Sequence, residues 1–223
     1  MNEHLKAILA TLRMNGNLRM RLEKIFDAKE PVTAIDLRGS EHGKKLDVSK
    51  EDLPALLQIC REIPTLQTLI IIGHHIDDEG VALISEAIPR LRELQVLHIE
   101  GNSMSGRGIG HVASGIVTHP SLEIVYLRGD MLDDEAVDHI VRVTLSNSRI
   151  HRLSIKGYQI SKEGIQHLSN LILIDRLDQI SITCANLSIE SCQLLGKLIA
   201  KNNKLESLVI RARKIDDLNF LLD

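Results

Sequence analysis

A six-residue aliphatic pattern, L-x-x-L-x-L with Ile or Val allowed for Leu, recurs along this chain and constrains its fold more than any other feature. The middle aliphatic residues of six copies are Leu69, Leu97, Val125, Leu153, Ile180 and Leu208, which are 28 residues apart except for one interval of 27. An earlier copy has its middle residue at Ile35, 34 residues before Leu69. Seven copies at a nearly constant period predict an array of similar structural units.

Each copy is followed by an apolar residue and then by a residue type that caps helices. The seven capping positions are Ser49, Asp77, Ser105, Asp133, Ser161, Ser188 and Asp216. Apolar pairs three residues apart, such as Val81 and Ile84, follow the caps and form one face of a helix. Each unit is therefore predicted to be a short strand, a turn and a helix of about three turns. Successive strands should pair in parallel, because every connection contains a helix.

The 28-residue pattern, with a small residue in the first turn of most helices (Gly80, Gly108, Ala136, Gly164, Ser191), resembles the ribonuclease-inhibitor-like class of leucine-rich repeats. The resemblance implies an α/β solenoid of about seven 28-residue repeats, with a parallel β-sheet on the concave face and helices on the convex face. One departure concerns the Asn or Cys that the class carries three residues after the last strand anchor, since only Asn102 matches here. Gly stands one position earlier in five copies, at Gly39, Gly73, Gly101, Gly129 and Gly157, where we expect it to permit a tight exit from the strand.

The domain organisation follows from where the repeat begins. We assign residues 32–223 to leucine-rich repeats and residues 1–31, with apolar residues at helical spacing, to a helical N-terminal cap. Six extra residues at positions 40–45 account for the long first interval. The seventh copy stops at Asp223, leaving Phe220, Leu221 and Leu222 to close the core. This predicts a monomer or weak end-to-end association, or a chain truncated from a longer one.

Composition excludes several classes of protein. With 43% hydrophobic and 26% charged residues, the chain fits neither a disordered nor a membrane protein, and we expect no membrane insertion. Two Phe, two Tyr, no Trp and a formal net charge of -3 argue against nucleic-acid binding. Three Cys, and first residues that do not resemble a signal peptide, lead us to expect a cytoplasmic protein with free thiols. Small proteins of this class also resemble effectors that intracellular bacteria deliver, which would place it in a host cell's cytoplasm.

Motifs for catalysis and for cofactors carry little weight in this sequence. The run from Gly108 to Ala113 matches the loose dinucleotide form G-x-G-x-x-A, but the repeat already explains Gly108. The cluster His74-His75-Ile76-Asp77-Asp78 invites a metal hypothesis, yet Asp77 is committed as a helix cap. Cys60 and Cys192 fall on core positions, whereas Cys184, at a strand exit, is predicted to be the thiol that could be exposed and reactive. We expect no cofactor, no metal and no enzyme activity.

Candidate binding residues come from the outward-facing positions of the predicted strands, which form columns about 4.8 Å apart from strand to strand. Three such columns are predicted, and their outward side chains would line the concave face. On the central strands they gather Tyr, Arg and other polar residues, the first two of which are enriched at binding hot spots. The candidate partner-binding residues are His98, Glu100, Tyr126, Arg128, Arg152 and Lys156. One column is mainly basic (Arg38, Arg128, Lys156, Arg211), so we expect a partner protein with an acidic surface.

Two functions remain open from the sequence. The first is a non-catalytic protein-protein interaction module that binds a partner protein through its concave face. The alternative is a regulator of a host or cellular enzyme. The resemblance extends to Ran GTPase-activating proteins, which use an Arg on an early repeat, and this implies Arg38 as the candidate here.

Overall fold

The computed structural model describes residues 3–12, 14–27, 30–38, 40–41, 44–46, 48–173 and 175–215. Its centre is a parallel sheet of seven strands whose spatial order follows the chain. The strands are β1 (Ala34–Asp36), β4 (Thr68–Asp77), β5 (Val96–Ser103), β6 (Ile124–Arg128), β7 (Arg152–Lys156), β8 (Gln179–Leu187) and β9 (Ser207–Ile215). Between them run α3 (Leu53–Arg61), α4 (Asp78–Ala87), α5 (Gly106–Ile116), α6 (Asp134–Ser146), α7 (Lys162–Leu173) and α8 (Ile189–Ile199). The predicted α/β class and parallel pairing are confirmed.

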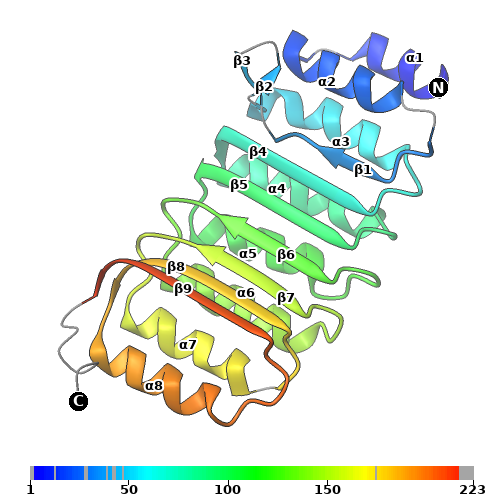
Figure 1. Ribbon diagram of the computed structural model, residues 1–223. Helices are drawn as coiled ribbons and strands as arrows, with labels where there is room; N and C mark the ends of the chain where they lie inside the picture. Colours follow the sequence, from blue (N-terminus) through cyan, green and yellow to red (C-terminus); the bar gives the residue numbers. More distant parts are fainter. Residues whose placement is uncertain are drawn as a thin grey trace.

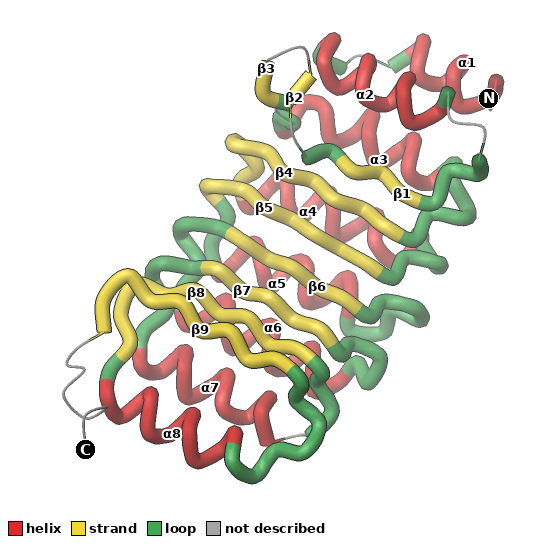
Figure 2. Tube along the Cα trace, in the orientation of Figure 1, coloured by secondary structure: helices red, strands yellow, loops and turns green. Residues whose placement is uncertain are grey.

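All six of these helices lie on one side of the sheet, so the other side is left uncovered by any described element (Figure 1). Figure 2 shows the same layering, with the strands in yellow in front of the helices in red. We call the uncovered side the open face. Side chains that point away from the helices therefore line one broad surface.

The register of the sheet is the one that the aliphatic pattern predicts. Leu69 pairs with Leu97, Leu97 with Val125, and Val125 with Leu153, and the pairing continues to β9. Because alternate residues of a strand face opposite sides, these residues point into the core and their neighbours point to the open face. The middle anchors are buried from Ile35 to Ile180, whereas Leu208 on β9 is half-buried.

Side-chain caps begin the helices at the predicted positions. Asp77 accepts a hydrogen bond from Gly80 N at 2.8 Å, and Asp133 accepts one from Ala136 N at 3.1 Å. The hydroxyls of Ser105, Ser161 and Ser188 accept backbone N–H groups of the helices that they precede. Ser49 precedes η1 (Lys50–Asp52), a 3₁₀ turn that leads into α3. Asp216, the seventh predicted cap, lies outside the described residues.

The first residue of two helices binds the cap of the next helix. Asp78 accepts hydrogen bonds from the backbone N and the hydroxyl of Ser105, at 2.8 and 2.6 Å. Asp134 does the same for Ser161, at 2.7 and 2.6 Å, and also accepts from Gly164 N at 3.0 Å. Each carboxylate thus satisfies N–H groups at the start of the following helix, where the helix dipole favours negative charge.

Lysine takes the same first position in two other units and reaches the following unit by an ion pair. Lys50 contacts Glu79 and lies 3.6 Å from the Asp77 carboxylate. Lys162 lies 3.9 Å from Glu190. At the equivalent position α5 has Gly106, where a Cβ would lie 2.6 Å from an Asp133 carboxylate oxygen. The junctions between helix starts are therefore of more than one chemical kind.

A second set of polar links joins the units near the opposite ends of the helices. Asn147 Nδ2 donates to the carbonyl oxygens of Ile116 and His119, at 2.9 and 3.1 Å. Arg176 binds the Thr144 carbonyl, and Asn202 Nδ2 donates to that of Ile172 at 2.5 Å. These side chains satisfy carbonyl groups of the preceding unit that its own helix leaves unpaired. This series is distinct from the Asn position of the repeat class discussed above, and the Asn102 side chain lies outside the described part of the chain.

The glycines after the strands allow close packing of neighbouring turns. A Cβ at Gly101 would lie 2.8 Å from the Ile76 carbonyl oxygen, and one at Gly129 would lie 2.9 Å from the Gly101 carbonyl oxygen. Neither glycine has a left-handed backbone. Their small size, and not a left-handed backbone, is therefore what these tight turns require.

Two helices precede the sheet. α1 (Glu3–Thr11) and α2 (Gly16–Phe26) lie beyond β1 at the N-terminal end, and Leu5, Leu9 and Phe26 on them are buried in the same core as the strands (Figure 1). The extra residues before α3 form a two-stranded antiparallel pair, β2 (Ser40–Glu41) and β3 (Lys44–Lys45). No helix in the described ranges is both long enough and apolar enough to span a bilayer.

Candidate functional site

Strands β5, β6 and β7 bring the six predicted binding residues together on the open face. His98 pairs with Tyr126 and Tyr126 with Ser154 across neighbouring strands. In the next column Glu100 pairs with Arg128 and Arg128 with Lys156. Arg152 begins β7 and is exposed. The residues of the predicted columns are therefore neighbours in space.

The centre of this group is held by its own contacts. The His98 ring meets the Tyr126 ring edge to face, with centroids 5.6 Å apart and an interplanar angle of 76°. His98 is only 7% exposed, whereas Tyr126 is half-buried. Part of the Tyr126 side chain therefore stays accessible on the open face.

The carboxylate of Glu100 lies between the imidazole of His98 and the guanidinium of Arg128. It is 3.5 Å from His98 Nε2 and 3.8 Å from a guanidinium nitrogen of Arg128. Burial, followed by the charge of Arg128, lowers the pKa of His98 from its ordinary value, and Glu100 opposes that shift. His98 is therefore uncharged near neutral pH, so Glu100 and Arg128 form the charged pair at the centre of the face.

A second group of cations lies at the end of β7 and along β9, and the sequence predicted only part of it. Arg211 and Arg213 are exposed on β9, and Lys156 ends β7. Tyr158, in the loop after β7, has Arg213 3.6 Å and Lys156 5.2 Å from its ring centroid. In the sequence, the two arginines at alternate positions of Arg211-Ala212-Arg213 indicate such a group on one side of a strand. Nothing in the sequence indicates that the ring of Tyr158 contacts these cations.

A hollow of about 330 Å³ adjoins Tyr158. It lies between the turn after β7 and the end of β8 with the start of α8, and its lining includes Tyr158, Gln159, Lys162, Asn186 and Ser188. Most of its wall is apolar, and the amide groups of Gln159 and Asn186 and the hydroxyl of Ser188 add polar positions, so the hollow can receive a side chain with both apolar and polar parts.

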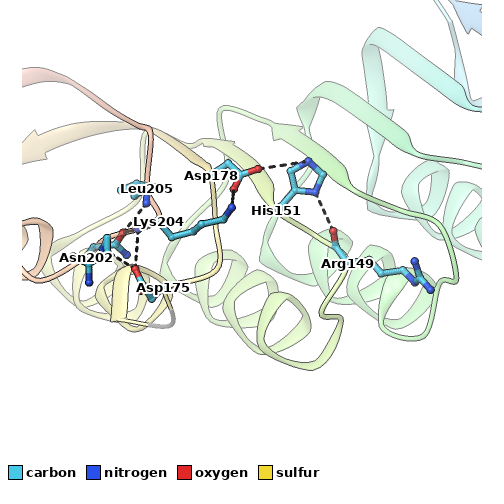
Figure 3. A network of polar contacts seen from close by, with 8 residues as sticks. Arg149, His151, Asp175, Asp178, Asn202, Lys204 and Leu205 are labelled. Carbon is cyan, nitrogen blue, oxygen red and sulfur yellow. Dashed lines mark hydrogen bonds and ion pairs between the residues drawn. The ribbon is translucent and has the colours of Figure 1, made fainter.

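The opposite ends of the strands carry a row of acidic and amide groups. In this row His151 Nε2 is 3.9 Å from Asp178, and the same carboxylate is 3.2 Å from Lys204 Nζ (Figure 3). Asp175 accepts from the backbone N of Asn203 and of Lys204, at 2.7 and 2.9 Å. These contacts fix the turns before β8 and β9. Acidic side chains thus gather where the strands begin, together with the cations Arg152 and Lys204, whereas Arg128 and Lys156 end β6 and β7.

Arg38 is the residue implied by the likeness to GTPase-activating proteins, and its guanidinium group is paired with the carboxylate of Asp36, two residues earlier in the chain. Its Nε lies 3.0 Å from both carboxylate oxygens of Asp36, and a terminal nitrogen lies 2.6 Å from one of them. This pair holds the pKa of Asp36 below its usual value. An arginine that stabilises a phosphoryl transition state has to present its charge to a partner. The geometry of Arg38 does not favour that role.

The prediction that Cys184 is exposed is wrong. β8 continues to Leu187, so Cys184 keeps the inward alternation of Ile180 and Ile182 and is fully buried. Burial raises the pKa of its thiol, which suppresses the reactive thiolate. Cys60 is buried as predicted, and burial raises its pKa to about 12. Cys192, predicted to be a core residue, is only half-buried.

The glycine-rich run at the start of α5 is already occupied by a carboxylate. Asp78 binds Ser105 at this helix start, and a Cβ on Gly108 would collide with the same carboxylate. An anion position therefore exists here, but the preceding unit fills it. Gly108 is explained by packing against Asp78, and the structure does not favour the dinucleotide reading.

The metal hypothesis gains no support from the described residues. No group of three or more His, Cys, Asp or Glu side chains in them is arranged to hold a metal ion. Asp77 is engaged as the cap of α4. The side chains of His74 and His75 lie outside the described part of the chain.

No protein-family model matches this chain, and no curated protein sequence does. Among solved structures it is similar to a chain described as "Leiomodin-1 Actin-Binding Site 2 (ABS2)". The two chains are 12% identical, the match covers 85% of this chain and 91% of the other, and the TM-score is 0.45. A similarity of this size carries no argument about function or partner.

Proposed function

We propose that this chain is a leucine-rich-repeat solenoid of the ribonuclease-inhibitor-like class that binds a partner protein through its concave, open face. About seven 28-residue units make up residues 32–223, and residues 1–31 cap the first of them. The sequence period and the parallel strand–helix units support this assignment. The buried free thiols Cys60 and Cys184 suit a reducing compartment, and we place the protein in a cytoplasm.

One observation carries the functional proposal. The helices occupy one side of the sheet, while the open face presents Tyr126, Arg128 and Arg152 on neighbouring strands without a covering element in the described chain. Tyr and Arg supply a large share of the energy at protein interfaces, because each combines contact area with directed polar groups. No catalytic set of side chains accompanies them in the described residues, so binding is the activity that this face supports.

The test is capture of a partner followed by mapping of the contact. A photo-cross-linking residue in place of Tyr126 should link to the partner, whereas one in place of Arg142, exposed on α6, should not. Tyr126→Ala and Arg128→Ala should each weaken binding roughly thirtyfold, as expected for residues worth about 2 kcal/mol. Glu86→Ala and Arg142→Ala on the helix side are the matched controls. Loss of binding in the helix-side variants, with normal binding by the open-face variants, would overturn the proposal.

A further inference from the structure

The uncompensated positive charge of the open face is concentrated at the end of β7 and along β9. In the centre of the face, Glu100 is close to both Arg128 and His98. By contrast, Lys156, Arg211 and Arg213 have no carboxylate within ion-pair distance among the described residues. Three neighbouring cations without a counter-charge define a surface whose electrostatic partner is not supplied by the described chain.

Tyr158 holds two of these cations close together. Arg213 and Lys156 both lie against its ring, and the two come from strands that are separated by β8. Contact with Arg213, and to a lesser degree with Lys156, lowers the pKa of the Tyr158 hydroxyl. The ring therefore offsets part of the repulsion between two like charges and keeps them positioned at the edge of the face.

The span of the cations indicates what they can contact at once. Neighbouring strands are about 4.8 Å apart, so β7 and β9 are separated by roughly 10 Å. Two or three acidic side chains of one extended segment can therefore contact the cations of both strands at once. The hollow beside Tyr158 offers room for a further side chain of that segment.

We propose that Lys156, Arg211 and Arg213, arranged around Tyr158, form a docking surface for an acidic segment of the partner protein. This inference rests on the proposed function and gives the partner's chemistry. The segment lies across the strand ends, with its carboxylates on the three cations. Charge complementarity of this kind chiefly sets the encounter rate and the choice of partner.

A nucleic acid fits this surface less well than an acidic segment does. Glu123, Asp178 and Glu206 stand at the opposite ends of the strands, and the whole chain has a net charge of -3. A nucleic-acid backbone is a long polyanion that is bound through many phosphate contacts. A short acidic segment can follow the basic strand ends and avoid the acidic row.

The probe for this surface is a fluorescently labelled peptide of about ten residues in which Glu alternates with Gly, an extended chain long enough to span the site. Its binding is measured by fluorescence anisotropy with the full chain. We expect binding that weakens severalfold as salt rises from about 20 to about 200 mM, because exposed charges are screened. The same peptide with Gln in place of Glu should not bind.

A triple variant tests the assignment to these residues. Lys156→Gln with Arg211→Gln and Arg213→Gln should reduce binding of the Glu peptide at least tenfold. Arg61→Gln with Arg90→Gln and Arg107→Gln, three exposed arginines of the helix side, changes the net charge equally and should leave binding within twofold. The double variant Arg211→Lys with Arg213→Lys should keep most of the binding of the Glu peptide. Far-ultraviolet circular dichroism and an unfolding midpoint establish that each variant is folded.

Four results would overturn the inference: no binding of the Glu peptide, equal binding of the Gln peptide, an equal loss in the control triple, or tighter binding of a single-stranded oligonucleotide of the same charge. The captured partner then separates this inference from the proposed function. If Tyr126→Ala weakens binding of the partner and the basic triple variant does not, the open face binds the partner, but the assignment of the docking surface to Lys156, Arg211 and Arg213 is wrong. If only helix-side variants weaken binding of the partner, the proposed function itself is wrong.

Discussion

His119 donates a hydrogen bond from Nε2 to the carbonyl oxygen of Leu91, 3.0 Å away and one unit earlier in the chain. A carbonyl oxygen only accepts, so the proton of the ring is on Nε2. Nδ1 accepts from Ser121 N at 3.3 Å and therefore carries no proton. The buried ring joins two units as a neutral tautomer, and a second proton would remove one of its two hydrogen bonds.

Acidification should therefore weaken the fold through His119. Burial lowers its pKa below the ordinary 6.5, and burial likewise lowers that of His98. The unfolded chain then binds more protons than the folded chain between 6.5 and the lowered pKa. The stabilisation is complete above pH 6.5 and falls as the pH drops toward the pKa of the folded chain. Urea unfolding at pH 7.5 and 5.5 measures it, and His119→Asn should show a shallower decline than the parent.

Two glycine substitutions should have opposite signs. Gly164→Ala places a Cβ against the Asp134 carboxylate and 2.8 Å from Ile160 Cγ2, so we expect a loss of about 1–3 kcal/mol. Gly196, exposed on α8, has no atom within 4 Å of that position. Gly196→Ala should stabilise by about 0.5–1 kcal/mol, because glycine is unfavourable inside a helix. Chemical denaturation of both variants gives the comparison, and a common sign would contradict the packing described for Gly164.

Asp134→Ala should destabilise the chain by about 1–2 kcal/mol. It removes the acceptor of three donors at the start of α7, the backbone N and hydroxyl of Ser161 and Gly164 N. Glu135→Ala is the matched control, since Glu135 is exposed and lies 3.6 Å from His139 within the same helix. We expect about 0.5 kcal/mol or less for the control. Equal losses of unfolding free energy in the two variants would show that the hydrogen bonds from Asp134 to the next unit do not stabilise the chain.

Truncation of a strand anchor should cost most in the middle of the sheet. Leu127 on β6 is fully buried, and Leu127→Ala should cost about 2–5 kcal/mol. Leu208 on β9 is half-buried, so the same change there should cost clearly less. An unfolding midpoint for Leu127→Ala equal to that of the parent chain would refute the strand register.

Much of the fold follows from the spacing of apolar residues. A one-residue slip would turn every anchor to the wrong side, so the pattern alone predicted that His98 pairs with Tyr126 and Tyr126 with Ser154. The caps were equally predictable, because Asp77 and Asp133 act within three residues of their own position. Local chemistry and a fixed period suffice for such features.

Contacts that join different units were beyond the same reasoning. Arg213 stacks on Tyr158, which follows β7, although β8 lies between β7 and β9. This contact depends on the rotamers of two long side chains, which the aliphatic pattern does not specify. Cys184 was misplaced because the length of β8 was underestimated, and one more alternation reverses inside and outside. The Asp36–Arg38 pair likewise depends on rotamers that a column of residues does not specify.

The differing junctions at the helix starts set which pieces of this chain are interchangeable. If residues 77–132 were excised, Asp133 and Glu135 would occupy the places of Asp77 and Glu79, and Lys50 would keep acidic partners. If only residues 77–104 were excised, Lys50 would instead face Arg107 at the place of Glu79. For shortening, lengthening or grafting at this junction, the natural module is thus a pair of strand–helix units, although the aliphatic pattern repeats with every one.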